Sequence, residues 1–316
     1  EGSDVDKRER DKRKYKRRKD MELQSFGLIN WLVLGTYLCA NIVLGFVLSK
    51  KVTTADDFFV GQRNIPWWAI GISVVATYVS ALSFLGGPAW SYTEGLSVIA
   101  IHLNYPIVIF IVIAFFLPFF FNSGCASIYE YLEKRFGPTT RSVISIIFLI
   151  SQCLTSAAIL YATALVLEFI TGMPVVYAII IITLIALVYT IMGGLAAVIW
   201  TDVIQAFMLL VGALIITVSL INNLNLPLGE TLELLKSQGK TNPLNFSFDI
   251  TEVSTVWTGV IAMTLFHITV YGANQMMVQR TLASKNIGDA KKSFLMMGYF
   301  AIFIYFLFFL LGILFY

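Results

Sequence analysis

Long apolar runs separated by polar connections repeat along the chain from residue 27 to its last residue. They consist mostly of Leu, Ile, Val, Phe and Ala, and none alternates apolar with polar residues as the strands of a membrane barrel do. A helix that crosses a bilayer needs about 20 such residues. The pattern therefore predicts an all-α polytopic membrane protein with about eight helices. The predicted spans are 27–49, 67–93, 96–121, 139–170, 174–192, 195–222, 254–280 and 293–316.

The connections between these runs carry local signals of their own. Residues 127–136 place apolar side chains on one face and charged ones on the other, and Gly137 and Pro138 follow. This predicts a short interfacial helix that ends at residue 136. The pair Gly193–Gly194 predicts a tight turn between two spans. The longest connection, 223–253, contains a brief helical stretch near 232–236.

Composition supports the same class, since the chain is 58% hydrophobic and only 13% charged. From Met21 onward the basic residues concentrate in alternate connections, while the opposite connections contain only Lys236 and Lys240. By the positive-inside rule the richer set is cytoplasmic, which puts the residues before the first span outside. That set is Lys50, Lys51, Arg63, Lys134, Arg135, Arg141, Arg280, Lys285, Lys291 and Lys292.

The first twenty residues contradict this orientation, because they contain ten Lys or Arg residues. We interpret Met21 as the natural start and residues 1–20 as a basic leader that is not native. A genuine basic tail that binds anionic lipid is the alternative. At the other end, an apolar run stops at Tyr316 without a polar tail, which predicts a fragment or a truncated chain.

The second span contains a helix-breaking sequence. Gly86 and Gly87 weaken the helix, and Pro88 lacks the amide that would bond the carbonyl of Phe84. Backbone freed at membrane depth survives only where it lines a buried or watery cavity, as in the interrupted helices of secondary transporters. We therefore predict a functional helix break at Gly86, Gly87 and Pro88. A simple proline kink is the alternative.

Asp202 is a carboxylate that lies well inside a span. It follows Gly194 by eight residues, which puts it about 12 Å from the cytoplasmic side of the membrane at about 1.5 Å per residue. Acids inside membranes are costly and usually face a cavity, an ion path or a partner. The alternative is a structural pairing with a lysine or a backbone donor.

Other polar side chains gather in the seventh span. Asn274, Gln275 and Gln279 are too many amides for a lipid face, so this stretch should face helices or water, and Gly272 permits a local break. His102 in the third span is a further buried polar residue. A lone buried histidine is more often a satisfied structural donor than a ligand, so a structural role is its alternative.

The inventory of reactive residues argues against an enzyme. Cys39, Cys125 and Cys153 are scattered and the chain has two histidines, so neither a metal site nor a disulfide framework can be built from their spacing. The sequence contains no nucleophile–base pair and no phosphate-binding loop. We therefore predict a protein that is not an enzyme and that uses no organic cofactor.

Four blocks of the sequence resemble the sodium/solute symporter family, and its iodide, monocarboxylate and vitamin branch more than its glucose branch. The blocks are 57–63, 76–88, 193–205 and 271–280, and the resemblance covers nearly everything from Met21 to Tyr316. It implies two inverted five-helix repeats with one extra leading helix. The chain then divides into the leader 1–20, an extra transmembrane helix and cytoplasmic loop 21–66, a first repeat 67–222, an extracellular loop 223–253 and an incomplete second repeat 254–316.

The resemblance also implies a sodium site at backbone carbonyls of the first broken helix, which fall on Ala76 and Val79. Hydroxyl groups from a helix of the second repeat, which this chain does not reach, complete that site in the family. Asp202 falls on the route by which sodium leaves inward. A chain that ends at Tyr316 would lack half of its sodium site, so function is predicted for the full-length protein.

The family positions that contact solute fall on Ser83, His102, His267 and Val270, and we count Asn274 and Gln275 as further candidate substrate-binding residues. Three groups that contact sugar in the family are replaced here, by Ser83, Val270 and Ala301, which disfavours a hexose. His102 and His267 could donate hydrogen bonds to an anionic group. The resemblance therefore favours a small organic anion such as a monocarboxylate or sialic acid.

The expected function is sodium-coupled import of this solute by alternating access across the cell (plasma) membrane. Sodium is the coupling ion, and the solute and the lipid bilayer are the expected partners, with no role for nucleic acid. Two alternatives stay open from the sequence: a membrane sensor of the same fold, and a proton-coupled carrier. Uptake that responds to pH and ignores sodium would identify the proton-coupled carrier.

Overall fold

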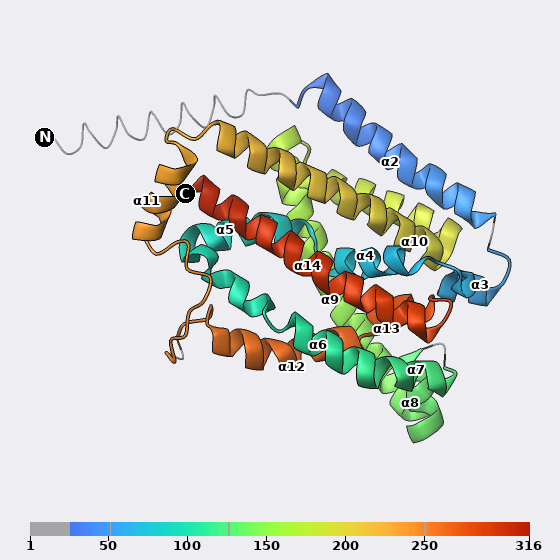
Figure 1. Cartoon of the computed structure of the whole chain (residues 1–316). Coiled ribbons are helices and arrows are strands. Elements are labelled where there is room, and N and C mark those ends of the chain that lie inside the picture. The colour runs from blue at the N-terminus through green and yellow to red at the C-terminus, as the bar shows by residue number, and fades with distance from the viewer. Residues whose placement is uncertain (1–25, 51, 126, 250) are drawn as a thin grey trace, which may run out of the picture.

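The computed structural model describes residues 26–50, 52–125, 127–249 and 251–316, so the predicted leader 1–20 lies outside the described residues. The described part contains helices, one isolated β-bridge and no strand (Figure 1), which confirms the all-α prediction. Short 3-10 or π segments are labelled η. The elements are α2 Leu28–Ser49, α3 Ala55–Val60, η1 Gly61–Arg63, α4 Trp67–Tyr78, α5 Ala81–Glu94, η2 Gly95–His102, α6 Tyr105–Ile111, η3 Val112–Phe116, α7 Leu117–Ser123, α8 Ile128–Phe136, α9 Pro138–Thr171, α10 Val175–Asn222, α11 Leu228–Ser237, η4 Thr258–Ala262, α12 Met263–Ile268, η5 Thr269–Ala273, α13 Gln275–Leu282 and α14 Ile287–Phe315.

Five helical stretches of the described part are long and apolar enough to cross a membrane, fewer than the eight predicted spans. The predicted spans 174–192 and 195–222 are two helices that share the label α10 and meet at Gly194, whose backbone is not helical, with φ 57° and ψ −152°. Glycine adopts this left-handed φ without a steric penalty, so the predicted turn between the two spans is confirmed at Gly194. The five stretches are Leu28–Ser49, Ala81–Ser123, Pro138–Thr171, Val175–Asn222 and Ile287–Phe315.

Three of the other predicted spans are assembled from shorter elements, and 96–121 consists of η2, α6, η3 and α7. Residues 67–93 are divided into α4 and α5, and residues 254–280 are divided among η4, α12, η5 and α13. The backbone leaves the helical conformation at Val79–Ser80 between α4 and α5, and at Asn274 before α13. Both interruptions lie inside apolar segments, where freed backbone groups need protein or ion partners.

Helix α14 runs through the middle of the molecule (Figure 1) and packs against α4, α5 and α10. Glycine permits this close approach: a Cβ on Gly71 of α4 would lie 2.6 Å from the carbonyl oxygen of Ser293 in α14. Lipid tails are as apolar as the side chains, so such close packing is what holds membrane helices together. The large side chains of α14 that are buried include Phe294, Met297, Ile304, Phe308, Phe309 and Leu311.

The structure corrects the predicted helix break at Gly86, Gly87 and Pro88. All three residues lie inside α5, and the interruption lies six residues or more before them, at Val79–Ser80. The glycine has a packing role, since a Cβ on Gly87 would lie 3.3 Å from the Cβ of Phe308 in α14. Ser91 supports the turn after the proline by donating to the carbonyl oxygens of both Pro88 and Phe309. The proline is therefore tolerated inside α5 because contacts with the neighbouring helix stabilise this turn, as is common in membrane helices.

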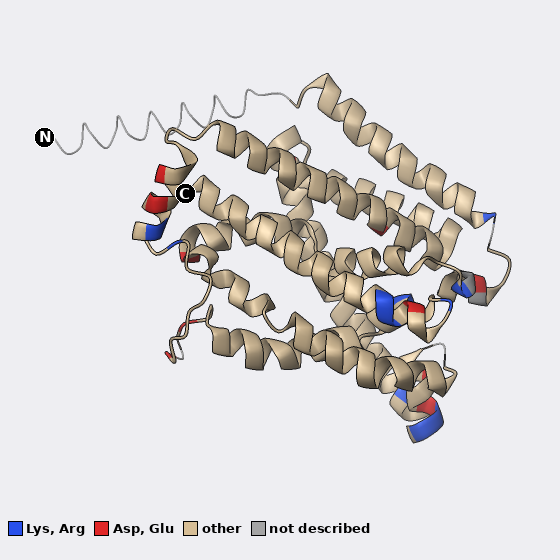
Figure 2. Ribbon diagram, viewed as in Figure 1, with Lys and Arg blue, Asp and Glu red and all other residues tan. Residues whose placement is uncertain are grey.

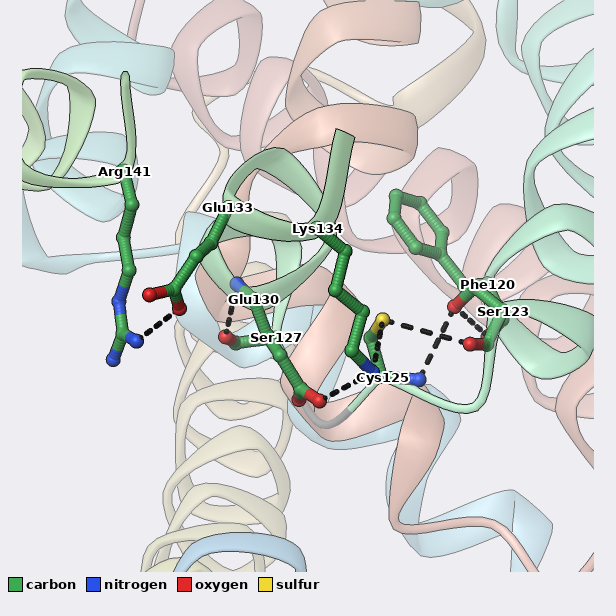
Figure 3. A network of polar contacts seen from close by, with 8 residues as sticks. All are labelled: Phe120, Ser123, Cys125, Ser127, Glu130, Glu133, Lys134 and Arg141. Atoms are coloured by element: carbon green, nitrogen blue, oxygen red, sulfur yellow. Dashed lines mark hydrogen bonds and ion pairs between the residues drawn. The ribbon is translucent and has the colours of Figure 1, made fainter. Parts of the chain in front are cut away.

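The predicted short helix after residue 127 is confirmed as α8, Ile128–Phe136, with Gly137 at its C-terminal end. Ser127 caps its first turn by accepting the amide of Glu130 at 3.1 Å. Figure 3 shows the network around this helix, in which Lys134 contacts Glu130 at 2.7 Å and the thiol of Cys125 at 3.5 Å. The hydrogen bond with Glu130 raises the pKa of Lys134. An ion pair between Glu133 and Arg141 joins α8 to α9.

Charged residues lie mostly at the two ends of the helix bundle (Figure 2). The predicted helical stretch of the connection 223–253 is confirmed as α11. Lys240, which follows it, donates to the carbonyl oxygens of Tyr92 and Thr93 at the last turn of α5. A cation suits this position because the last carbonyls of a helix carry partial negative charge. This connection is therefore fastened to the end of the interrupted helix pair α4–α5.

Candidate functional site

The interruption between α4 and α5 leaves backbone carbonyl oxygens without their helical donors. Val79 and Ser80 are extended, with ψ 104° and ψ 178°. Ser80 and Ser83 cap each other: the N–H of Ser80 donates to Oγ of Ser83 at 3.4 Å, and the N–H of Ser83 donates to Oγ of Ser80. In a continuous helix these two amides would bond the carbonyl oxygens of Ala76 and Val79. The reciprocal cap thus diverts both donors from the two carbonyls on which the predicted sodium site falls.

A cluster of stacked rings lies close to this interruption. The Tyr78 ring at the end of α4 lies 5.7 Å from that of Tyr271 in η5. Tyr271 in turn meets Tyr105 of α6, with the two hydroxyl oxygens 3.2 Å apart. The His102 ring lies 3.9 Å from that of Tyr305 in α14, nearly parallel to it. We call this the ring cluster; its members are Tyr78, His102, Tyr105, His267, Tyr271 and Tyr305.

The structure brings the two histidines of the sequence together in the ring cluster. Their ring centroids are 6.1 Å apart, and the ring of Tyr105 lies 5.0 Å from His267 and 5.4 Å from His102. Both histidines are buried. The two histidines, which are far apart in the sequence, thus lie in the same cluster.

The polar atoms of these histidines differ in how well they are satisfied. Nδ1 of His267 lies 2.8 Å from Nδ2 and 3.2 Å from Oδ1 of Asn104; when it accepts from the closer amide nitrogen, Nε2 carries the proton. Nδ1 of His102 is buried and has no hydrogen-bond partner among the described residues. Buried polar atoms are rarely left unpaired in native proteins. An unpaired imidazole nitrogen inside a ring cluster is what a site awaiting a polar ligand would contain.

Of the remaining predicted substrate-binding residues, Ser83 reaches the ring cluster through a side-chain hydrogen bond with Tyr305, whereas the other three have no polar contact with it. Val270 is buried and apolar. Asn274 caps α13 by accepting the amide of Met276 at 2.9 Å. Gln275 accepts the amide of Ile128 at 2.9 Å and so fastens α13 to the start of α8. The amide-rich stretch therefore faces other helices, which is one of the two environments expected from the sequence.

Asp202 is paired with Arg280. Oδ2 of Asp202 lies 3.2 Å from the guanidinium NH2 of Arg280 and 2.5 Å from the Ser73 hydroxyl, which donates to it. Nε of Arg280 donates to the same Ser73 oxygen at 3.0 Å. Arg280, which the charge pattern places in a cytoplasmic connection, belongs to the helix α13 and is only 7% exposed.

Several residues of these two sites were missed from the sequence. Ser73 and Arg280 complete the Asp202 cluster, and Tyr105 and Tyr305 complete the ring cluster. The sequence did contain evidence that Arg280 is buried, since it directly follows the amide-rich stretch of the seventh span. A basic residue next to so many polar groups could have been predicted to lie inside the helix bundle. The tyrosines carried no such signal, because aromatic residues are common throughout the chain.

Comparison with known proteins identifies the family. The profile of the sodium:solute symporter family matches residues 58–316, which is most of the chain. The chain belongs to this family. Its described part has an all-α polytopic transporter fold similar to that of a solved Na+-coupled sialic acid symporter in a substrate-bound outward-open state, with a TM-score of 0.86 and 33% identity over 92% of this chain and 60% of that one.

Curated relatives point in the same direction. The sodium/sialic acid symporter SiaT of Proteus mirabilis is 34% identical over 274 residues, which are 86% of this chain and 55% of that protein. The human sodium/iodide cotransporter is 32% identical over 277 residues, or 87% of this chain and 43% of its own. Bovine sodium-coupled monocarboxylate transporter 2 is 29% identical over 86% of this chain and 44% of its own. The chain thus spans about half the length of these relatives.

Proposed function

We propose that the whole protein is a sodium-coupled symporter that imports a small organic anion by alternating access. The observation that carries this proposal is the reciprocal cap of Ser80 and Ser83, which diverts two amide donors from the carbonyls of Ala76 and Val79. Unwound carbonyls of interrupted helices are the groups with which such transporters bind sodium. Hydroxyl groups of the second repeat would complete the ion's coordination.

The ring cluster is the proposed solute site. His102 offers a nitrogen without a partner among the described residues, and Nε2 of His267 is the donor when Asn104 occupies Nδ1. A solute with a carboxylate could accept from both rings while its apolar part packs against the tyrosines. Relatives that carry sialic acid and monocarboxylates support an acidic solute over a neutral one.

Sodium and solute are coupled through helix α4 in this proposal. The sodium carbonyls lie at the end of α4, and Tyr78 from the same turn contacts the ring cluster. An ion that holds the turn in its extended form therefore also positions one wall of the solute site. The coupling is reciprocal, so solute raises the affinity for sodium by the same factor. Inward sodium movement is favoured by about 2.3 kcal/mol per charge per 100 mV.

The proposal includes an orientation in the plasma membrane. The basic end of the molecule, with Lys50, Lys134 and Lys292, would face the cytoplasm, and Lys236 and Lys240 the exterior. The chain before α2 then lies outside. Residues 67–222 and 254–316 would form the first repeat and the beginning of the second one. Cysteine labelling of single-site variants from either side of sealed cells would test this arrangement.

Thermal unfolding of the purified whole protein tests the function. Organic acids, sugars and amino acids are added in sodium or in choline, and a solute that binds raises the unfolding free energy by about 2.7 kcal/mol at 100 times its Kd. We expect acids to stabilise the protein in sodium and not in choline. Equal stabilisation in both salts would contradict sodium coupling, and a response that follows pH instead would identify a proton-coupled carrier.

A matched pair of variants assigns the two sites. His102→Gln should weaken the stabilisation by solute and leave that by sodium alone unchanged. Ser80→Ala should weaken the stabilisation by sodium, since the freed amide of Ser83 can then bond the carbonyl of Val79. A solute effect that survives His102→Gln in full would remove the ring cluster from the solute site.

A further inference from the structure

Asn104 is a fully buried asparagine at the junction between η2 and α6. It stands at the N-cap position of α6, where its backbone carbonyl accepts the amide of Val108 at 3.0 Å. An asparagine side chain in this position commonly caps the helix by accepting an amide of the first turn. The side chain of Asn104 makes no such bond. Its amide group is therefore available to contact another part of the molecule.

The group that Asn104 contacts is the imidazole of His267 in α12. Nδ1 of His267 lies 2.8 Å from Nδ2 and 3.2 Å from Oδ1 of Asn104. Among the described residues, the imidazole makes hydrogen bonds through Nδ1 only. The other ring nitrogen, Nε2, is therefore the one with which His267 can bind a solute.

Close packing fixes how the His267 ring meets Asn104. The ring of Tyr105, the residue after Asn104, lies 5.0 Å from that of His267 and within 12° of parallel to it. The backbones of η2 and η4 approach so closely that a Cβ on Gly259 would overlap the carbonyl oxygen of Ala100. Since η4 leads directly into α12, this approach holds the segment of His267 against that of Asn104. A close-packed interior of this kind keeps both side chains in one arrangement.

The contact with Asn104 decides which nitrogen of His267 carries the proton. In a neutral imidazole one nitrogen donates and the other accepts. The closer atom of Asn104 is its amide nitrogen, which can only donate, so Nδ1 accepts and Nε2 carries the proton. An Nε2–H group pairs with a hydrogen-bond acceptor such as a carboxylate oxygen. It leaves a donor of the solute unpaired, which is costly where the group is buried.

We propose that Asn104 is a positioning residue that determines the specificity of the solute site, because it holds His267 in the tautomer that donates from Nε2. The site then selects a solute that presents a carboxylate to His267 over one that presents an N–H donor in the same place. The proposal rests on the proposed function, in which His267 contacts the solute, and it names the residue that selects an acid.

Nitrogen NMR of the imidazole rings tests the tautomer in the absence of solute. The purified whole protein contains histidine labelled with the heavy nitrogen isotope, and the His267 signals are assigned by their loss in His267→Gln. We expect a bare Nδ1 and a protonated Nε2 in the wild type. Asn104→Asp should have a protonated Nδ1, because a carboxylate only accepts. A protonated Nδ1 with a bare Nε2 in the wild type would overturn the proposal, and this holds even if the variant fails to fold.

Solute binding tests whether this tautomer sets the specificity. Lactate, sialic acid and the carboxamide of each are titrated in sodium, and the ratio of the affinities for acid and carboxamide is compared between variants. In Asn104→Asp the ratio should fall by about tenfold, since Nε2 then accepts from the carboxamide instead of donating to the acid. Asn104→Leu, which adds no charge, should also lower the ratio because nothing then fixes the tautomer.

The matched control is Asn41→Leu, because Asn41 is another buried asparagine, whose amide donates to the Tyr37 carbonyl within α2. It should leave the His267 tautomer and the affinity ratio as in the wild type. A role of Asn104 in packing alone would weaken the binding of acid and carboxamide equally. An unchanged ratio in both Asn104 variants would therefore overturn the proposal.

The same titrations distinguish this proposal from the proposed function. If an acid binds in a sodium-dependent way and its preference over the carboxamide does not depend on Asn104, the proposed function stands and the role of Asn104 is overturned. If neither acid binds in sodium, the proposed function is overturned, and the selection of acids by Asn104 is overturned with it.

Discussion

Two interruptions of helical backbone lie close together in this protein, and they use their polar residues in opposite ways. At Val79–Ser80 two serines cap each other and thereby divert donors from backbone carbonyls. At Asn274 the polar side chains of the following helix each bind a different neighbour: Gln275 the start of α8, Gln279 the helix α3, and Arg280 both α4 and α10. The first interruption leaves backbone carbonyl oxygens without their helical donors, whereas at the second one the polar side chains form hydrogen bonds with neighbouring helices.

The two interruptions have similar local sequences but different contacts in the folded protein. Both segments are apolar helices with a small residue and a cluster of polar ones. What separates them is where the polar side chains find their partners. Serines that satisfy one another locally leave the surrounding carbonyls open to an ion, whereas long amide and guanidinium side chains reach across to other helices. In the proposed function the first interruption supplies ligands for sodium, whereas the polar side chains that follow the second one hold α13 against its neighbours.

The largest expected loss of stability comes from breaking the ion pair between Arg280 and Asp202 next to the second interruption. Arg280→Ala leaves the largely buried carboxylate of Asp202 without its partner, which should lower the unfolding free energy by about 3–5 kcal/mol. Chemical denaturation of the whole protein in detergent measures it. The double variant Asp202→Asn with Arg280→Gln should recover most of the loss because no unpaired charge remains. Equal losses in the single and double variants would contradict this account.

Overpacking the second interruption should have the next largest effect. A Cβ on Gly272 would lie 2.9 Å from the ring of Phe116 in η3, so Gly272→Val should lower stability by about 1–3 kcal/mol. Gly212→Ala is a control, since nothing lies within 4 Å of a Cβ built there. A Gly272→Val protein as stable as the control would show that η5 is not packed as closely as the structure indicates.

A smaller effect on stability, together with a specific loss of sodium binding, is expected at the first interruption. Ser80→Ala removes one side of the reciprocal cap, which is usually worth about 1 kcal/mol. The freed amide of Ser83 can then bond the Val79 carbonyl, so half-maximal stabilisation by sodium should require a higher concentration. Thermal unfolding across a sodium titration measures both quantities. A loss of stability with unchanged sodium dependence would show that this carbonyl is not an ion ligand.

The smallest expected loss of stability comes from removing the helix cap at the second interruption. Asn274→Ala deletes the acceptor for the Met276 amide at the start of α13, with an expected loss of about 0.5–1 kcal/mol. Because this cap is structural, the sodium titration should keep its midpoint. Asn274→Ser, which retains an acceptor, is the matched control. A shifted sodium midpoint in Asn274→Ala alone would mean that the two interruptions are not functionally distinct.

Much of the fold could be predicted from local patterns. The apolar runs predicted an all-α membrane protein, the bend at Gly194 followed from a glycine pair, and α8 followed from its charge pattern and the Gly137 that ends it. The helix break was misplaced at Pro88. Proline and glycine dominate any local estimate of helix breaking, whereas the actual break lies at two serines that cap each other's amides.

The sequence by itself determined the class of the protein, the extent of most helices and the family resemblance, because each depends on the order and spacing of residues close together in the chain. The tertiary structure alone decided which cation pairs with Asp202, and it was an arginine that counting had assigned to a cytoplasmic connection. Ser73 and Asp202 are 129 positions apart, as His267 and Asn104 are 163 apart. Such partners are selected by the packing of whole helices, where burial makes an unpaired charge or donor too unfavourable to persist.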